Sequence, residues 1–106
     1  ALGGLKQLRL CGAVLADADV RELARLKTLA SLALDGCRVG DAGVKELIPL
    51  QSLSRLDLTG TEVSDAGLND LARLPHLTNL VLYRTRVTDA GVRDFRQTLP
   101  RCQVFR

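Results

Sequence analysis

The chain has 106 residues, of which 46% are apolar, 25% charged and only 3% aromatic, and its formal net charge is +3. A chain of this length forms one domain with one modest core, which must be built from aliphatic side chains. No apolar stretch approaches the roughly 20 residues that span a bilayer, so the sequence excludes a membrane-spanning segment.

The excess of positive charge lies at the C-terminal end. The arginines there are Arg84, Arg86, Arg93, Arg96, Arg101 and Arg106, against Asp89 and Asp94. A solvated charged cap explains this cluster as well as an anionic partner does. Specific nucleic-acid binding usually requires a broader basic surface, often with interleaved aromatic residues, so the pattern argues against a nucleic-acid partner.

The sequence repeats itself every 24 residues. The repeat is defined by leucines at three positions, which are Leu5, Leu29, Leu53 and Leu77, then Leu8, Leu32, Leu56 and Leu80, then Leu10, Leu34, Leu58 and Leu82. Aspartate–alanine pairs keep the same period, at Asp17-Ala18, Asp41-Ala42, Asp65-Ala66 and Asp89-Ala90. A fixed period of this length is typical of solenoids, in which each unit buries its apolar face only against its neighbours.

We expect a single domain with full repeats at 5–28, 29–52, 53–76 and 77–98 and a closing segment at 99–106. Residues 1–4 match the tail of an upstream repeat, because Leu2 lies 24 residues before Leu26. The chain is therefore expected to be a fragment of a longer protein. Its first strand is then an uncovered sheet edge, which can also pair with a second copy of the chain.

The two halves of each repeat carry different patterns. The opening L-x-x-L-x-L predicts a short strand, because L-x-L places two leucines on one face and the residue between them on the other. In the second half, apolar residues recur every three positions, as at Val44, Leu47 and Leu50, which predicts a helix of about three turns. Stacked repeats then give a parallel sheet on one side and helices on the other.

Polar residues and glycines mark the predicted start of the helices. Aspartates that can accept from free backbone N–H groups are Asp41, Asp65 and Asp89. Ser64 and Thr88, directly before two of them, are alternative N-caps. The glycines predicted to mark close packing or turns here are Gly43, Gly67 and Gly91.

The pattern L-x-x-L-x-L-x-G-T-x-V-T-D-A-G-V resembles leucine-rich repeats of the ribonuclease-inhibitor and F-box-adaptor type, in the bacterial variety common in planctomycetes. The segment from Leu99 to Phe105 is similar to segments that close such arrays. The resemblance implies an α/β leucine-rich repeat solenoid of curved right-handed βα repeats, with parallel strands on the concave side and helices on the convex side.

The first repeat departs from this pattern. Ala13, Ala16 and Asp19 replace the usual Thr, Ser or Thr, and Gly, so its helix entry is expected to be looser. The position of Ala13 lies just past the strand, where leucine-rich repeats often place Asn to bond the turn. Thr61 and Thr85 can do part of that work, and Ala13 cannot.

The sequence shows no catalytic or metal-binding constellation, and we predict no enzyme activity, cofactor or metal. No H-E-x-x-H, G-x-S-x-G or Walker-type sequence occurs, and His76 is interpreted as a surface loop residue. Widely spaced Cys11, Cys37 and Cys102 indicate neither a zinc site nor a disulfide framework. Cys37 is expected to be buried and Cys102 to help close the C-terminal end, with a Cys11–Cys37 disulfide as the weaker alternative.

Outward-facing strand residues are expected to form an exposed grid. Its three rows are Gln7, Ser31, Arg55 and Asn79; Arg9, Ala33, Asp57 and Val81; and Cys11, Asp35, Thr59 and Tyr83. Tyr83 with the following Arg84 is the pair expected to carry most binding energy, because Tyr and Arg are enriched at such positions. Candidate partner-binding residues are therefore Arg9, Asp35, Arg55, Asp57, Asn79, Tyr83 and Arg84.

Other interpretations of these residues stay open. The charges of the grid can simply keep the strand face solvated. Asp35 and Asp57 as a metal or acid–base pair would lack further ligands. The predicted function is a protein- or peptide-binding module that uses the strand face, and the alternative is a structural scaffold segment of a larger repeat protein with no ligand of its own.

Overall fold

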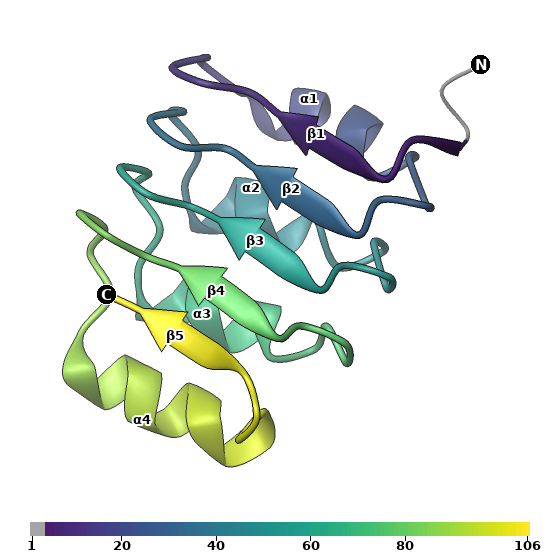
Figure 1. Cartoon of the computed structure of the whole chain (residues 1–106). Coiled ribbons are helices and arrows are strands. Elements are labelled where there is room, and N and C mark those ends of the chain that lie inside the picture. The colour runs from purple at the N-terminus through teal and green to yellow at the C-terminus, as the bar shows by residue number, and fades with distance from the viewer. Residues whose placement is uncertain (1–3) are drawn as a thin grey trace.

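The computed structural model describes residues 4–106, so the register of Leu2 lies outside the described residues. Strands and helices alternate along the chain, in the order β1 (Gln7–Arg9), α1 (Asp17–Leu23), β2 (Ser31–Ala33), α2 (Asp41–Lys45), β3 (Arg55–Asp57), α3 (Asp65–Leu71), β4 (Asn79–Val81), α4 (Asp89–Thr98) and β5 (Gln103–Phe105). The strands form one parallel sheet in sequence order, and the helices cover one of its faces (Figure 1). The predicted βα solenoid is confirmed.

Neighbouring strands pair exactly one 24-residue period apart. Gln7 pairs with Ser31, Ser31 with Arg55 and Arg55 with Asn79. The first two predicted rows of outward-facing residues are therefore confirmed. In the described part of the chain, β1 pairs on one side only, with β2, and so forms the edge of the sheet.

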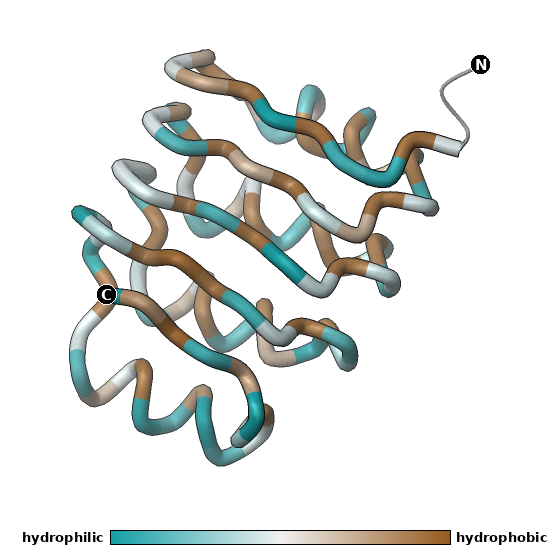
Figure 2. Tube along the Cα trace, viewed as in Figure 1, coloured by the Kyte–Doolittle hydropathy of each residue, from teal (hydrophilic) through white to brown (hydrophobic). Residues whose placement is uncertain are grey.

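The core lies between the sheet and the helices and is aliphatic, as predicted. Inward-facing strand leucines alternate with outward-facing residues, and Figure 2 shows the resulting change of brown and teal along the strands. Leu32, Leu56 and Leu80 are almost completely buried, whereas Leu8 of β1 is only half-buried because no earlier repeat covers it among the described residues. At the other end, Phe95 of α4 takes the position of Leu71 and is also fully buried.

The predicted helix length of about three turns is wrong for α1, α2 and α3. Seven residues are helical in α1 and α3, five in α2 and ten in α4. The end of α2 tightens into turns in which each N–H bonds the carbonyl three residues back, from Glu46 to Gly43 and from Leu47 to Val44. This is the 3₁₀ pattern, whose period of three matches the spacing of the apolar residues. Pro49 then removes a donor.

The turns after β3 and β4 are closed by the threonines Thr61 and Thr85, which were singled out in the sequence. The Thr61 hydroxyl donates to the Leu58 carbonyl at 2.7 Å, and the Thr85 hydroxyl donates to the Leu82 carbonyl at 2.8 Å. Both bonds confirm that threonine takes up backbone groups of the turn.

Aspartates at the helix starts bond the next repeat, which corrects their predicted role at their own helix. Asp41 accepts from the backbone N–H of Ser64 at 2.7 Å and from its hydroxyl. Asp65 bonds Thr88 in the same way, and the Thr88 hydroxyl in turn caps α4 by accepting from the Gly91 N–H. The N-caps of α3 and α4 are therefore Ser64 and Thr88.

The glycines after these aspartates make room for the contact between repeats. A Cβ atom at Gly67 would lie 2.5 Å from Oδ1 of Asp41, and one at Gly91 would overlap the Asp65 carboxylate. The predicted close packing is confirmed. In the first repeat the helix entry is held differently, because the Asp19 carboxylate accepts from the Ala16 N–H at 3.0 Å.

Candidate binding surface on the strand face

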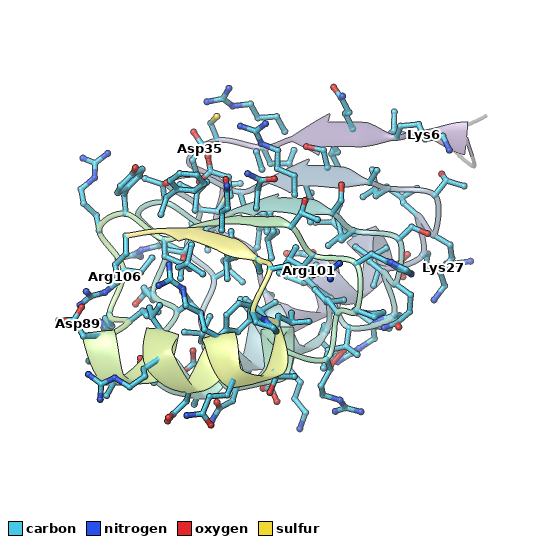
Figure 3. The ribbon with its side chains drawn as sticks, turned by 60° about the horizontal axis from the view of Figure 1, so that its bottom comes forward. Lys6, Lys27, Asp35, Asp89, Arg101 and Arg106 are labelled. Atoms are coloured by element: carbon cyan, nitrogen blue, oxygen red, sulfur yellow. The ribbon has the colours of Figure 1, made fainter. Side chains whose placement is uncertain are left out.

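The face of the sheet opposite the helices carries the predicted partner-binding residues. The strand register places Arg9, Arg55, Asp57 and Asn79 on this face, and the row that contains Asp35 and Tyr83 continues at the carboxyl ends of the strands. Figure 3 shows side chains projecting from this face, with Lys6 and Asp35 at opposite ends of the strands. The residues thus share one surface, as the sequence predicted.

A polar cluster joins the first two repeats. Nη2 of Arg9 lies 3.1 Å from Oδ2 of Asp35, and the Cys11 thiol donates to the same oxygen at 3.3 Å. The hydrogen bonds from Arg9 and then from Cys11 hold the pKa of Asp35 below its ordinary value, and the bond to the Asp35 carboxylate raises the pKa of Arg9. The other oxygen, Oδ1 of Asp35, is buried and has no hydrogen-bond partner among residues 4–106.

One carboxylate oxygen of Asp57 is already hydrogen-bonded to Thr59, at the end of the same strand. Its Oδ1 accepts from the Thr59 N–H at 2.9 Å and from the Thr59 hydroxyl at 2.7 Å. This local pattern stabilises the turn after β3. Among the described residues, no group of three or more His, Cys, Asp and Glu side chains lies together as a metal site would require.

One hollow on the strand face is a trough of about 700 Å³, here called the strand trough. Its lining residues come from β1, β2, β3 and the segments before them: Lys6, Gln7, Leu8, Arg9, Ala30, Ser31, Leu32, Ala33, Ser54, Arg55 and Asp57. Lys6 and Arg55 are exposed and form no ion pair with the described residues. Sequence reasoning missed Lys6, because it precedes the three rows.

A second hollow, of about 500 Å³, lies at the carboxyl ends of the strands and is lined by Asp35, Gly36, Thr59, Gly60 and Arg84. The backbone here is left-handed in every repeat. Gly36 and Gly60 have φ of 73°, as Gly12 has 69°, whereas the fourth repeat has Arg84 at 55°. A side chain in this region is disfavoured, and such residues cluster at binding sites.

Aromatic side chains are exposed beside Arg84. Tyr83 is 47% exposed, and Phe105 of β5, which pairs with Val81, is 38% exposed. The sequence analysis expected 99–106 to close the array but missed Phe105 as a strand-face residue. The signal was present, since Phe105 lies one period after Val81.

The cysteines and the arginine-rich end complete the candidates from the sequence. The three cysteines are free, so the alternative of a Cys11–Cys37 disulfide is wrong. Cys37 is buried as predicted, Cys102 in the closing segment is also buried, and burial raises the pKa of Cys102 to about 11. In the arginine-rich end, Arg106 pairs with Asp89 and donates from Nε to the Val87 carbonyl at 2.9 Å, which fits a charged cap.

Two segments of the chain, 25–47 and 50–72, match the family model described as Leucine Rich repeat. No curated protein sequence matches the chain. No helix in the described part of the chain has the length and apolar character needed to cross a membrane.

Several solved structures are similar to most of this chain, including three from different organisms. A leucine-rich repeat protein of Leptospira interrogans is 24% identical, with a TM-score of 0.70 over 94% of this chain, which spans only 25% of that protein. The Mex67:Mtr2 subunits of Chaetomium are 20% identical, with a TM-score of 0.73 over 93% of this chain and 76% of the other. An internalin of Listeria monocytogenes is 19% identical, with a TM-score of 0.60 over 98% of this chain and 35% of the other. The fold is a leucine-rich repeat solenoid.

Proposed function

We propose that this chain is a non-enzymatic module that binds a protein or peptide on its strand face. The observation that supports this most is the strand trough, where the side chains of Lys6 and Arg55 are exposed and form no ion pair with residues 4–106, on the face of the sheet that no helix covers. Helices cover the opposite face of the sheet, so its uncovered face offers a grid of side chains whose chemistry varies from repeat to repeat. The G-T-x-V-T-D-A-G pattern further supports a bacterial repeat of the ribonuclease-inhibitor type.

The test is capture of partners with this chain as bait, beside a Tyr83→Ala/Arg84→Gly variant. Glycine is chosen at position 84 because the equivalent positions of the other repeats hold glycine in the same backbone conformation. The control is Arg93→Ala on the helix side. A protein retained by the wild type and the control, and lost from the double variant, supports the proposal. Identical recovery with these three baits and with a Lys6→Gln/Arg55→Gln bait, which changes the strand trough, contradicts it.

The alternative is a scaffold segment with no ligand of its own. The observation that favours it is a series of hydrogen bonds between repeats, in which Asp41 accepts from Ser64 and Asp65 accepts from Thr88. These bonds stabilise the contact between neighbouring repeats. Retrieval of nothing by the wild-type bait, at a concentration where the protein is folded, supports this alternative.

A further inference from the structure

The strand trough has a floor of small side chains between walls of long ones. On β2, Ser31 and Ala33 face outward, and the strand register places Gln7 and Arg55 on either side of Ser31. Because neighbouring strands lie about 4.8 Å apart, these walls are separated by about 10 Å, which is enough for one extended peptide.

The end of the strand trough nearest the start of the strands carries hydrogen-bond donors. Lys6 and Arg55 have no ion-pair partner, and the side chains of Gln7 and Ser31 form no hydrogen bond with the described residues. Asp57 is the acidic residue that lines the strand trough, and Thr59 already occupies its Oδ1. This end therefore has an excess of positive charge and of unused donors, which favours an anionic group.

The other end of the same line is already paired. Asp35 continues the outward row of β2 after Ser31 and Ala33, and its Oδ2 accepts from Arg9 and Cys11, while its Oδ1 has no surface that a ligand could reach. The acidic group of a ligand therefore fits the amino end of the strand trough, beside Lys6 and Arg55, and not the end at Asp35. At about 3.3 Å per residue, the line from Ser31 to Asp35 spans about four residues of an extended chain.

We propose that the strand trough binds an extended acidic peptide segment of a partner protein. An Asp or Glu side chain of that segment lies over Ser31 between Lys6 and Arg55, and the rest of the peptide runs along β2 toward Asp35. This inference rests on the proposed function and adds the chemistry of the partner. Charge complementarity at the amino end and a width that fits one extended chain both support it.

A display library of short random peptides, selected on the full chain, tests the inference. Selected peptides are expected to share Asp or Glu at one position. Replacing that acid by its amide, or making Lys6→Gln/Arg55→Gln in the protein, should weaken binding roughly tenfold or more, because a charged hydrogen bond is lost. The matched control is Lys45→Gln/Arg73→Gln, which removes the same charge from exposed helix-side residues without ion pairs and should leave affinity unchanged.

A second variant separates this inference from the proposed function. Ser31→Tyr fills the strand trough at an outward position, and circular dichroism verifies its fold. Peptides without a shared acid whose binding is abolished by Ser31→Tyr overturn the acidic-peptide inference and leave the strand-face function standing. Peptides that bind the Ser31→Tyr variant normally, or a selection that enriches nothing, overturn both. Oligothymidylate that binds more tightly than the peptides, and depends on Arg55, overturns the inference in favour of a polyanion.

Discussion

The carboxylate of Asp65 accepts two hydrogen bonds from Thr88, one from the backbone N–H at 2.8 Å and one from the hydroxyl at 2.6 Å. Both bonds cross from the third repeat to the fourth. They hold the start of α4 in place and, because they require the ionised carboxylate, they hold the pKa of Asp65 below its ordinary value.

Asp65→Asn should lower the free energy of unfolding by about 1–2 kcal/mol at neutral pH, since an amide accepts more weakly and cannot accept both bonds as a carboxylate does. The lowered pKa makes this contribution complete above the ordinary Asp pKa of about 3.9 and lost as the pH falls below it. Urea unfolding at pH 7 and pH 3 measures both effects. With Asp94→Asn as the exposed control, equal stability of the two variants at pH 7 would show that the Asp65 bonds contribute nothing.

Gly40→Ser should stabilise the first joint between repeats. Gly40 takes the position of Ser64 and Thr88, with similar extended backbone angles and nothing within 4 Å of an added Cβ. The Asp17 carboxylate already points toward the next repeat, because its Oδ1 lies 3.4 Å from a Cβ built at Gly43.

A serine hydroxyl at position 40 can therefore donate to Asp17, and we expect a gain of about 1 kcal/mol over Gly40→Ala. The alanine variant serves as the control, because both substitutions reduce the conformational entropy of the unfolded chain by removing glycine, and only serine adds a hydroxyl. Thermal and urea unfolding of both variants give the comparison. The same midpoint for serine and alanine would mean that Asp17 does not bond across this joint.

Arg84→Gly should raise stability while weakening partner binding. The left-handed backbone at φ 55° disfavours any side chain, and glycine removes that cost, partly offset by the greater freedom of glycine in the unfolded chain. The expected net gain is about 0.5–1 kcal/mol, measured by urea unfolding. Gly60→Ala, at the equivalent position of the third repeat, should lose about 1 kcal/mol. A destabilised Arg84→Gly variant would instead mean that the arginine side chain stabilises the fold.

Cys11 should react with iodoacetamide long before Cys37 and Cys102. Cys11 is exposed, whereas the other two thiols are buried, and burial raises the pKa of Cys102 to about 11. The raised pKa favours the neutral thiol in the folded state, so this group stabilises the fold below pH 9 and the effect is lost as the pH rises toward 11. Mass spectrometry of tryptic peptides after timed alkylation at pH 8 gives the order of reaction. Simultaneous labelling of all three would indicate opening of the array.

The sheet and its register could be predicted from the sequence because every inward strand position repeats as leucine after one period. The fifth strand was harder to predict, since Val104 and Phe105 replace the usual pattern there. Helix lengths were overestimated because a spacing of three fits both an α-helical face and a 3₁₀ turn. The role of Asp65 was missed, since its partner Thr88 belongs to the next repeat and the contact depends on the missing side chain of Gly91.

The sequence predicted which residues share the candidate surface, but not the hydrogen bonds and backbone conformation found there. The grid followed directly from the period, so Arg55 and Tyr83 could be placed on one face. The conformation of Arg84 could also have been predicted, because the same register position is glycine in the other repeats. The buried, unpaired Oδ1 of Asp35 could not, since it depends on where Arg9 and Cys11 place their side chains.

The carboxylate links between repeats also give the array a direction. Asp41 and Asp65 each bond a hydroxyl residue of the following repeat, whereas Asp89 pairs with Arg106 of the closing segment. A repeat grafted after the third one therefore bonds Asp65 in the same way only if its helix begins with Ser or Thr, and one grafted after the fourth must first displace an arginine. The second and third joints thus select a hydroxyl residue, which Gly40 does not supply at the first joint, and extension beyond the fourth repeat competes with the Asp89–Arg106 ion pair.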